Sequence, residues 1–72
     1  MASDVCTLLG QRIRKLRLAR GWRQLDLAEQ AGINENYVSD LELGRKEICL
    51  RTIQAIAEAF EIKIADLTKG IG

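Results

Sequence analysis

The sequence contains no histidine and no proline, and it has only two cysteines among its 72 residues. Without histidine it lacks the commonest general base and the commonest metal ligand of proteins. Cys6 and Cys49 lie far apart and form no CxxC pair, so we expect two small, buried or half-buried thiols rather than a zinc or redox site. Glycine-rich phosphate-binding motifs are missing as well. The sequence therefore predicts no metal, no cofactor and no enzymatic activity.

Long apolar runs are also missing. No hydrophobic run approaches the ~20 residues that a membrane-spanning helix needs, and the N-terminal stretch MASDVCTLLGQRIR does not have the layout of a signal peptide. Hydrophobic residues make up 47% of the chain and charged residues 29%, which is typical of a soluble globular protein. We therefore expect one small domain, residues 1–72, that resides in the cytoplasm and binds no membrane.

The net charge is only +1, but the charges are unevenly distributed. Residues 1–23 carry six basic side chains against one acidic one, whereas residues 24–72 carry five basic and nine acidic ones. Such an asymmetry favours a surface that faces a polyanion, and it fits a solvated basic helix face equally well. Composition alone leaves both interpretations open.

Apolar residues recur at helical spacing in five stretches. Val5, Leu9, Ile13 and Leu16, for example, would share one face of a helix. No stretch alternates with period two over a useful length, so strands are not expected. The sequence predicts an all-α fold of five helices around one core. The expected helices cover residues 5–20, about 24–31, 35–43, about 50–60, and a short stretch from Ile64 that ends before Gly70.

The second and third expected helices are joined by a turn that is too short for an ordinary helical hairpin. Gly32 stands where such a turn requires a left-handed backbone, and Asn34 is a good N-cap for the helix that follows. Ala28 is small where the two helices would have to cross closely. This spacing predicts a helix-turn-helix at about residues 24–43.

The third expected helix has one apolar and one polar side. Val38 and Leu41 would point inward, whereas Asn36, Ser39, Asp40 and Leu43 would point the opposite way. The outward face is short, polar and able to form hydrogen bonds.

The run GWRQLDLAEQAGINENYVSDLELGRKEICLRTIQAIAEAF resembles the Xre, lambda-repressor/Cro-like helix-turn-helix family. The resemblance extends from GQRIRKLRLARGW to IADL and so covers nearly the whole chain. The tract NYVSDLE and the proline-free stretch KEICL resemble controller proteins of restriction-modification systems within that family. The resemblance implies a compact lambda-repressor-like domain that binds a double-stranded DNA operator, usually as a homodimer, and regulates transcription as a controller or a phage-type repressor.

The resemblance also implies roles for individual residues. Arg23 replaces the usual Ser or Thr at the start of the second helix, and we interpret this as a sign that the helix start meets a phosphate. Tyr37 is expected at the DNA backbone, with a half-buried structural role as the alternative. The expected base-reading residues are Glu35, Asn36, Ser39 and Asp40. The expected phosphate-contacting residues are Arg23, Gln24, Tyr37, Arg45, Lys46, Arg51 and Thr52.

Two further expectations come from the family, each with one alternative. Arg17 and Glu42 are expected to form an ion pair between the first and third helices; the alternative is two solvated charges. A homodimer interface is expected in the region of about residues 58–72, where apolar residues exceed what a small core needs; the alternative is that all of them are core. The expected interface residues are Phe60, Ile62, Ile64 and Leu67.

One competing function remains open from the sequence. The acidic side chains Glu35, Asp40 and Glu42 lower the affinity of the third helix for phosphates, which favours a protein-interaction module such as an antitoxin or adaptor. Asp26 and Glu29 on the second helix could face RNA polymerase, or they are merely solvated. A steep salt dependence of binding would distinguish DNA from protein as the partner.

Overall fold

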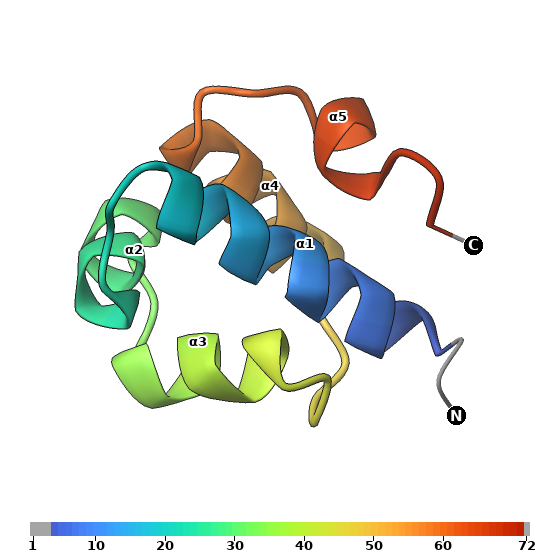
Figure 1. The fold of residues 1–72 in the computed structure, drawn as a ribbon, viewed down its shortest axis with the longest axis horizontal. Coiled ribbons are helices and arrows are strands. Elements are labelled where there is room, and N and C mark those ends of the chain that lie inside the picture. The colour runs from blue at the N-terminus through green and yellow to red at the C-terminus, as the bar shows by residue number, and fades with distance from the viewer. Residues whose placement is uncertain (1–3, 72) are drawn as a thin grey trace.

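The computed structural model describes residues 4–71, which form five α-helices and no strand. Figure 1 shows them around one centre, with the first and the last described residues on the same side of the molecule. The predicted all-α, five-helix fold is therefore confirmed, and every helix end lies within two residues of its predicted position. The helices are α1 (Val5–Ala19), α2 (Gln24–Ala31), α3 (Glu35–Glu42), α4 (Leu50–Ala59) and α5 (Ile64–Thr68).

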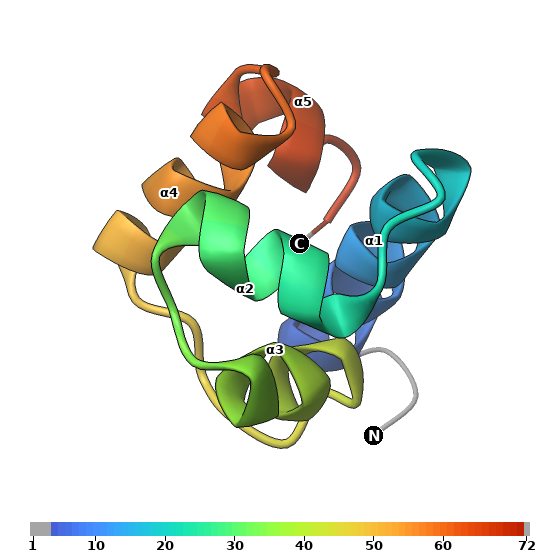
Figure 2. The same cartoon turned by 90° about the vertical axis from the view of Figure 1, so that its left-hand side faces the viewer.

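The core takes side chains from all five helices. α2 is central because it packs against α3 on one side and α4 on the other, as Figure 2 shows, while α5 packs on α4 and α1. Val5, which continues the apolar face of α1, is its first residue and is 51% exposed. The largest fully buried side chains are Ile13, Leu27, Val38, Leu41, Ile56, Phe60 and Leu67.

A backbone contact holds α3 against α1. A Cβ atom at Gly10 would lie 2.2 Å from the carbonyl oxygen of Leu41 and 2.8 Å from that of Glu42, so only glycine fits at this crossing. The sequence pointed to Ala28 as the small residue at a helix crossing, and Ala28 is indeed buried, but the tighter approach is at Gly10. The position of α3 relative to the scaffold is therefore set by backbone atoms.

Among the described residues, no helix combines the length and the apolar character needed to cross a membrane.

Candidate nucleic-acid interface

The α2–turn–α3 unit has the local geometry that the sequence predicts. Gly32 ends α2 with φ 70°, in the left-handed region, and the N–H of Ile33 donates to the carbonyl of Ala28 at 2.9 Å. Asn34 begins α3, and its side-chain oxygen accepts from the N–H of Asn36 at 2.7 Å. The helix-turn-helix is therefore present, with α3 capped at its N-terminus.

The outer face of α3 carries the four expected base-reading residues. Glu35 and Asn36 in the first turn are exposed, while Ser39 and Asp40 are half-buried. Val38 and Leu41 on the other side of the helix are each 1% exposed. The structure thus brings these four side chains together on one polar surface; their contact with bases stays a prediction.

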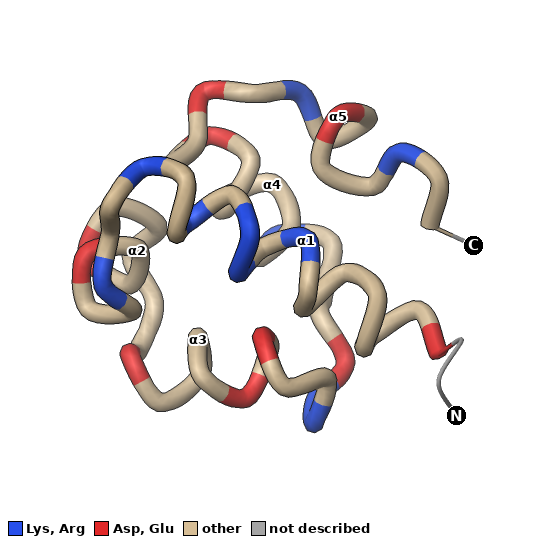
Figure 3. The backbone as a smooth tube through the Cα atoms, in the orientation of Figure 1, with Lys and Arg blue, Asp and Glu red and all other residues tan. Residues whose placement is uncertain are grey.

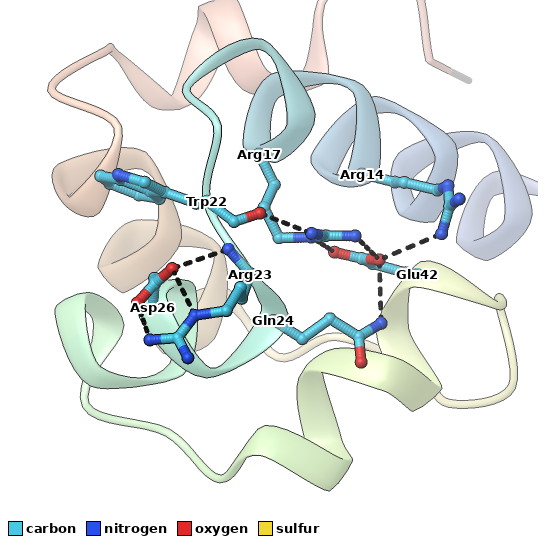
Figure 4. A network of polar contacts seen from close by, with 7 residues as sticks. All are labelled: Arg14, Arg17, Trp22, Arg23, Gln24, Asp26 and Glu42. Atoms are coloured by element: carbon cyan, nitrogen blue, oxygen red, sulfur yellow. Dashed lines mark hydrogen bonds and ion pairs between the residues drawn. The ribbon is translucent and has the colours of Figure 1, made fainter.

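A network around the Glu42 carboxylate joins α3 to α1 (Figure 4). The Arg17 guanidinium donates from Nε to Glu42 Oε2 at 2.6 Å and from a terminal nitrogen to Oε1 at 3.1 Å. Its other terminal nitrogen donates to the carbonyl oxygen of Trp22 at 2.7 Å. Both charged residues are 6% exposed, so the expected ion pair is present and the alternative of two solvated charges is wrong.

Gln24 extends this network to the start of α2. Its side-chain Nε2 donates to Glu42 Oε1 at 3.1 Å, and Arg14 on α1 approaches the same oxygen at 4.0 Å. The sequence placed Gln24 only at a phosphate, and it gave Arg14 no role. Helical spacing held a signal for Arg14, because it stands three residues before Arg17, the residue expected beside Glu42.

Arg23 has a partner within the chain. Its guanidinium bonds both oxygens of the Asp26 carboxylate, at 3.0 and 3.2 Å, and its backbone N–H donates to Asp26 Oδ2 at 2.7 Å. These bonds lower the pKa of Asp26 and raise that of Arg23. Asp26 therefore gives Arg23 a structural role at this helix start, and a phosphate contact by Arg23 stays a prediction.

The acidic character of α3 is partly neutralised. Figure 3 shows acidic positions along α3 and basic positions along α1. Asp40, expected at a base, pairs with Lys46, expected at a phosphate, at 3.2 Å. The Lys46 ammonium also lies 6.0 Å from the centre of the half-buried Tyr37 ring. The neighbouring residue Arg45 is exposed, so the loop after α3 still carries a positive charge at the surface.

The start of α4 fits the prediction only in part. Arg51 is exposed, but Thr52 is only 9% exposed and its hydroxyl lies 3.2 Å from the Cys49 sulfur. The expected phosphate contact of the Thr52 side chain is wrong, because this hydroxyl is turned back onto the helix start. Cys49 is itself exposed rather than buried, and the bond with Thr52, together with N–H groups of the helix start, lowers its pKa.

Two of the expected dimer residues lie in the core of the chain itself. Phe60 is 1% exposed because its ring stacks on Trp22, with centroids 5.5 Å apart and Arg20 over both rings. Leu67 is fully buried because α5 folds back onto α4 and α1. Phe60 and Leu67 are therefore wrong as interface residues, whereas Ile64 is 38% exposed and Ile62 is half-buried against the core.

Fold and site together define a five-helix domain built around a helix-turn-helix. The helix-turn-helix family matches residues 13–67, and the chain belongs to this family, with the Xre-like type of domain that its sequence indicates.

Named relatives support the same placement. An HTH-type transcriptional regulator of Deinococcus deserti, DdrOP3, is 43% identical over 63 residues, which cover 88% of this chain and 49% of the relative. The chain thus spans about half the length of that relative. The control protein C.BamHI of Bacillus amyloliquefaciens is 31% identical over 93% of this chain and 84% of its own length.

A solved structure shows the same fold. The restriction-modification controller protein C.AhdI of Aeromonas hydrophila superposes with a TM-score of 0.84 at 35% identity, over 86% of this chain and 94% of that one. The likeness therefore extends over most of the five-helix arrangement.

Proposed function

We propose that this chain is a sequence-specific, double-stranded DNA-binding regulator of transcription, and that α3 lies in the major groove. The observation that carries the proposal is the outer face of α3: a capped, polar helix start, held from behind by the buried Glu42 network and the Gly10 contact. A helix that reads bases has to be held rigidly, since its side chains must meet base edges in register. The relatives are named as regulators and controllers, which favours this function over an antitoxin-like module or an enzyme.

In this proposal Asn36 binds adenine bidentately, and a carboxylate of Glu35 or Asp40 accepts from cytosine N4. Ser39 completes the base-reading set. The backbone of the DNA is bound around it by the remaining exposed or half-buried candidates: Arg23, Gln24, Tyr37, Arg45, Lys46 and Arg51.

Selection of bound sequences from a random duplex pool, at two salt concentrations, tests the proposal. We expect a symmetric motif with half-sites about one helical turn apart (~34 Å), recovered less efficiently at the higher salt concentration. Asn36→Ala should relax the preference at one adenine by roughly 1–3 kcal/mol. The matched control is Gln54→Ala, which truncates an exposed amide on α4 and should leave the motif unchanged. A folded protein that enriches no sequence would overturn the proposal and favour a protein partner.

We further propose that the chain acts as a homodimer through the apolar end of the molecule. A hollow of about 150 Å³ lies there between the start of α1, the loop after α3 and the C-terminal segment. Leu50, the first residue of α4, follows the lining residue Ile48 by two positions and is 71% exposed. The lining residues are Val5, Cys6, Leu9, Ile48, Ile53 and Ile71.

Sedimentation equilibrium of two variants tests this surface. Leu50→Asp should shift the protein toward monomer, whereas Leu18→Asp, at a residue of α1 that is 53% exposed, should not. An equal response of both variants would show that the interface lies elsewhere.

The remaining parts of the proposal concern the setting of the protein. We propose that it works in the cytoplasm, where its operator would lie, and that RNA polymerase is a further partner through Glu29, which is exposed on α2. Transcription in vitro with Glu29→Gln tests the second point: a loss of activation with unchanged DNA binding supports it, and unchanged transcription contradicts it.

A further inference from the structure

The basic residues of α1 are used in different ways. Arg12 donates to the backbone carbonyls of Asp66, Leu67 and Lys69 at the end of α5, at 2.8–3.3 Å. Arg17 is buried in the Glu42 network. Lys15, which is exposed, lines a shallow hollow together with Gly70 and Ile71 on the α5 side of the molecule. Three of the α1 cations are thus directed either into the core or toward α5.

Arg14 is directed toward α3 instead. Its side chain is 59% exposed, and a terminal nitrogen lies 4.0 Å from Glu42 Oε1, beyond hydrogen-bond distance. Figure 4 shows the Arg14 guanidinium and the Gln24 amide at the same carboxylate of Glu42, Arg14 from above and Gln24 from below. Its position is therefore the junction of α1, the first residue of α2 and the last turn of α3.

The charges at this junction do not cancel. The Glu42 carboxylate is already bonded by Arg17 through two donors and by Gln24 through one. Arg14 adds a second cation to a single carboxylate, so the network carries a net charge of one positive unit, located on its exposed member. The guanidinium has five N–H donors in a planar fork that matches the geometry of a phosphate. The positive end of the α2 dipole lies beside Gln24 and favours an anion at the same place.

We propose that Arg14 binds a backbone phosphate of the DNA, at the edge of the groove that α3 enters. The inference rests on the proposed function and adds a residue outside the helix-turn-helix itself. It assigns α1 a direct part in DNA binding, in addition to its part in the core.

The test compares Arg14→Gln with Lys15→Gln. Both variants remove one positive charge from an exposed position of α1, at neighbouring residues that lie on different sides of the helix. Affinity is measured as a function of salt for the duplex recovered by selection and for a random-sequence duplex of the same length. We expect Arg14→Gln to weaken binding to both duplexes roughly three- to tenfold per bound protomer and to lower the salt slope by about 0.9 per protomer. Arg14→Lys should keep most of the slope, because the charge remains.

Each outcome decides one point. Lys15→Gln should leave the slope nearly unchanged; an equal loss in both glutamine variants would overturn the proposal and reduce Arg14 to a part of the general charge. An unchanged slope for Arg14→Gln would also overturn it. Equal melting temperatures of the variants and the wild type exclude unfolding as the cause. If the wild-type chain binds neither duplex, the proposed function fails, not the assignment of Arg14 alone.

Discussion

The buried and the exposed ion pair of α3 have different effects on the molecule. Arg17 and Glu42 have side chains that are 7% and 2% exposed, and they connect α1 to α3. Asp40 and Lys46, at 27% and 58%, connect α3 only to the loop that follows it. A buried pair is costly to break because the remaining charge has no water around it, whereas an exposed pair can exchange its partner for solvent or a phosphate. The first pair sets geometry, and the second adjusts the charge of a surface.

The largest expected effect is that of Glu42→Gln. The substitution leaves the Arg17 guanidinium buried without its carboxylate, and it should lower the free energy of unfolding by about 3–5 kcal/mol. Urea denaturation measures it. Glu47→Gln, at an exposed residue, serves as the control and should change stability by less than about 0.5 kcal/mol. Equal effects of the two substitutions would remove the distinction between buried and exposed charges.

Gly10→Ala tests the backbone contact beside the buried pair. The added Cβ would lie 2.2 Å from the Leu41 carbonyl oxygen, so α1 and α3 must move apart, at a cost of about 1–3 kcal/mol. Gly21→Ala is the comparison, since Gly21 has φ 68° but open space around it and should cost only about 1 kcal/mol of backbone strain. Only Gly10→Ala should also weaken DNA binding at temperatures where both variants are folded. An unchanged affinity would contradict the claim that this contact positions α3.

A double-mutant cycle of Asp40→Asn and Lys46→Gln measures the interaction free energy between the two residues of the exposed pair. We expect a coupling energy below about 1 kcal/mol in the unfolding free energy, because solvent screens the pair. A coupling as large as the effect of Glu42→Gln would show that the loop after α3 also carries the geometry of the site.

A smaller effect is expected from the pair of Arg23 and Asp26. Because Arg23 lowers the pKa of Asp26 below the ordinary value of about 3.9, the pair stabilises the fold above that pH. This contribution is lost as the pH falls through the lowered pKa. Melting temperatures of the wild type and Asp26→Asn should therefore differ at neutral pH and converge in acid. A difference that persists in strong acid, where Asp26 is protonated in both states, would have another cause.

The last prediction compares the two thiols. Desolvation and the carboxylate of Asp4 raise the pKa of Cys6, whereas the Thr52 hydroxyl and nearby N–H groups lower that of Cys49. Since the thiolate is the reactive form, iodoacetamide at pH 7.5 should modify Cys49 before Cys6, as peptide mapping by mass spectrometry would show. Thr52→Val should slow the reaction of Cys49 and leave that of Cys6 unchanged. Faster labelling of Cys6 would contradict the different environments of the two thiols.

The dimer residues show where sequence reasoning reaches its limit. Phe60, Ile64 and Leu67 all follow the helical pattern, and nothing in that pattern separates a core position from a surface one. Phe60 is buried by Trp22 and Arg20, which come from a segment about 40 positions earlier in the chain. The direction in which α5 folds back decided the burial of Leu67 and the partial exposure of Ile64.

The sequence by itself determined the five helices, the turn between α2 and α3 and the polar outer face of α3. These features depend on neighbours within a few residues: the helical period, the left-handed turn at Gly32 and the cap at Asn34. Only the tertiary structure decided the partner of Gln24, the burial of Thr52 and the burial of Phe60. Each of these depends on whether water or another segment surrounds a side chain, and that is settled only when distant parts of the chain pack together.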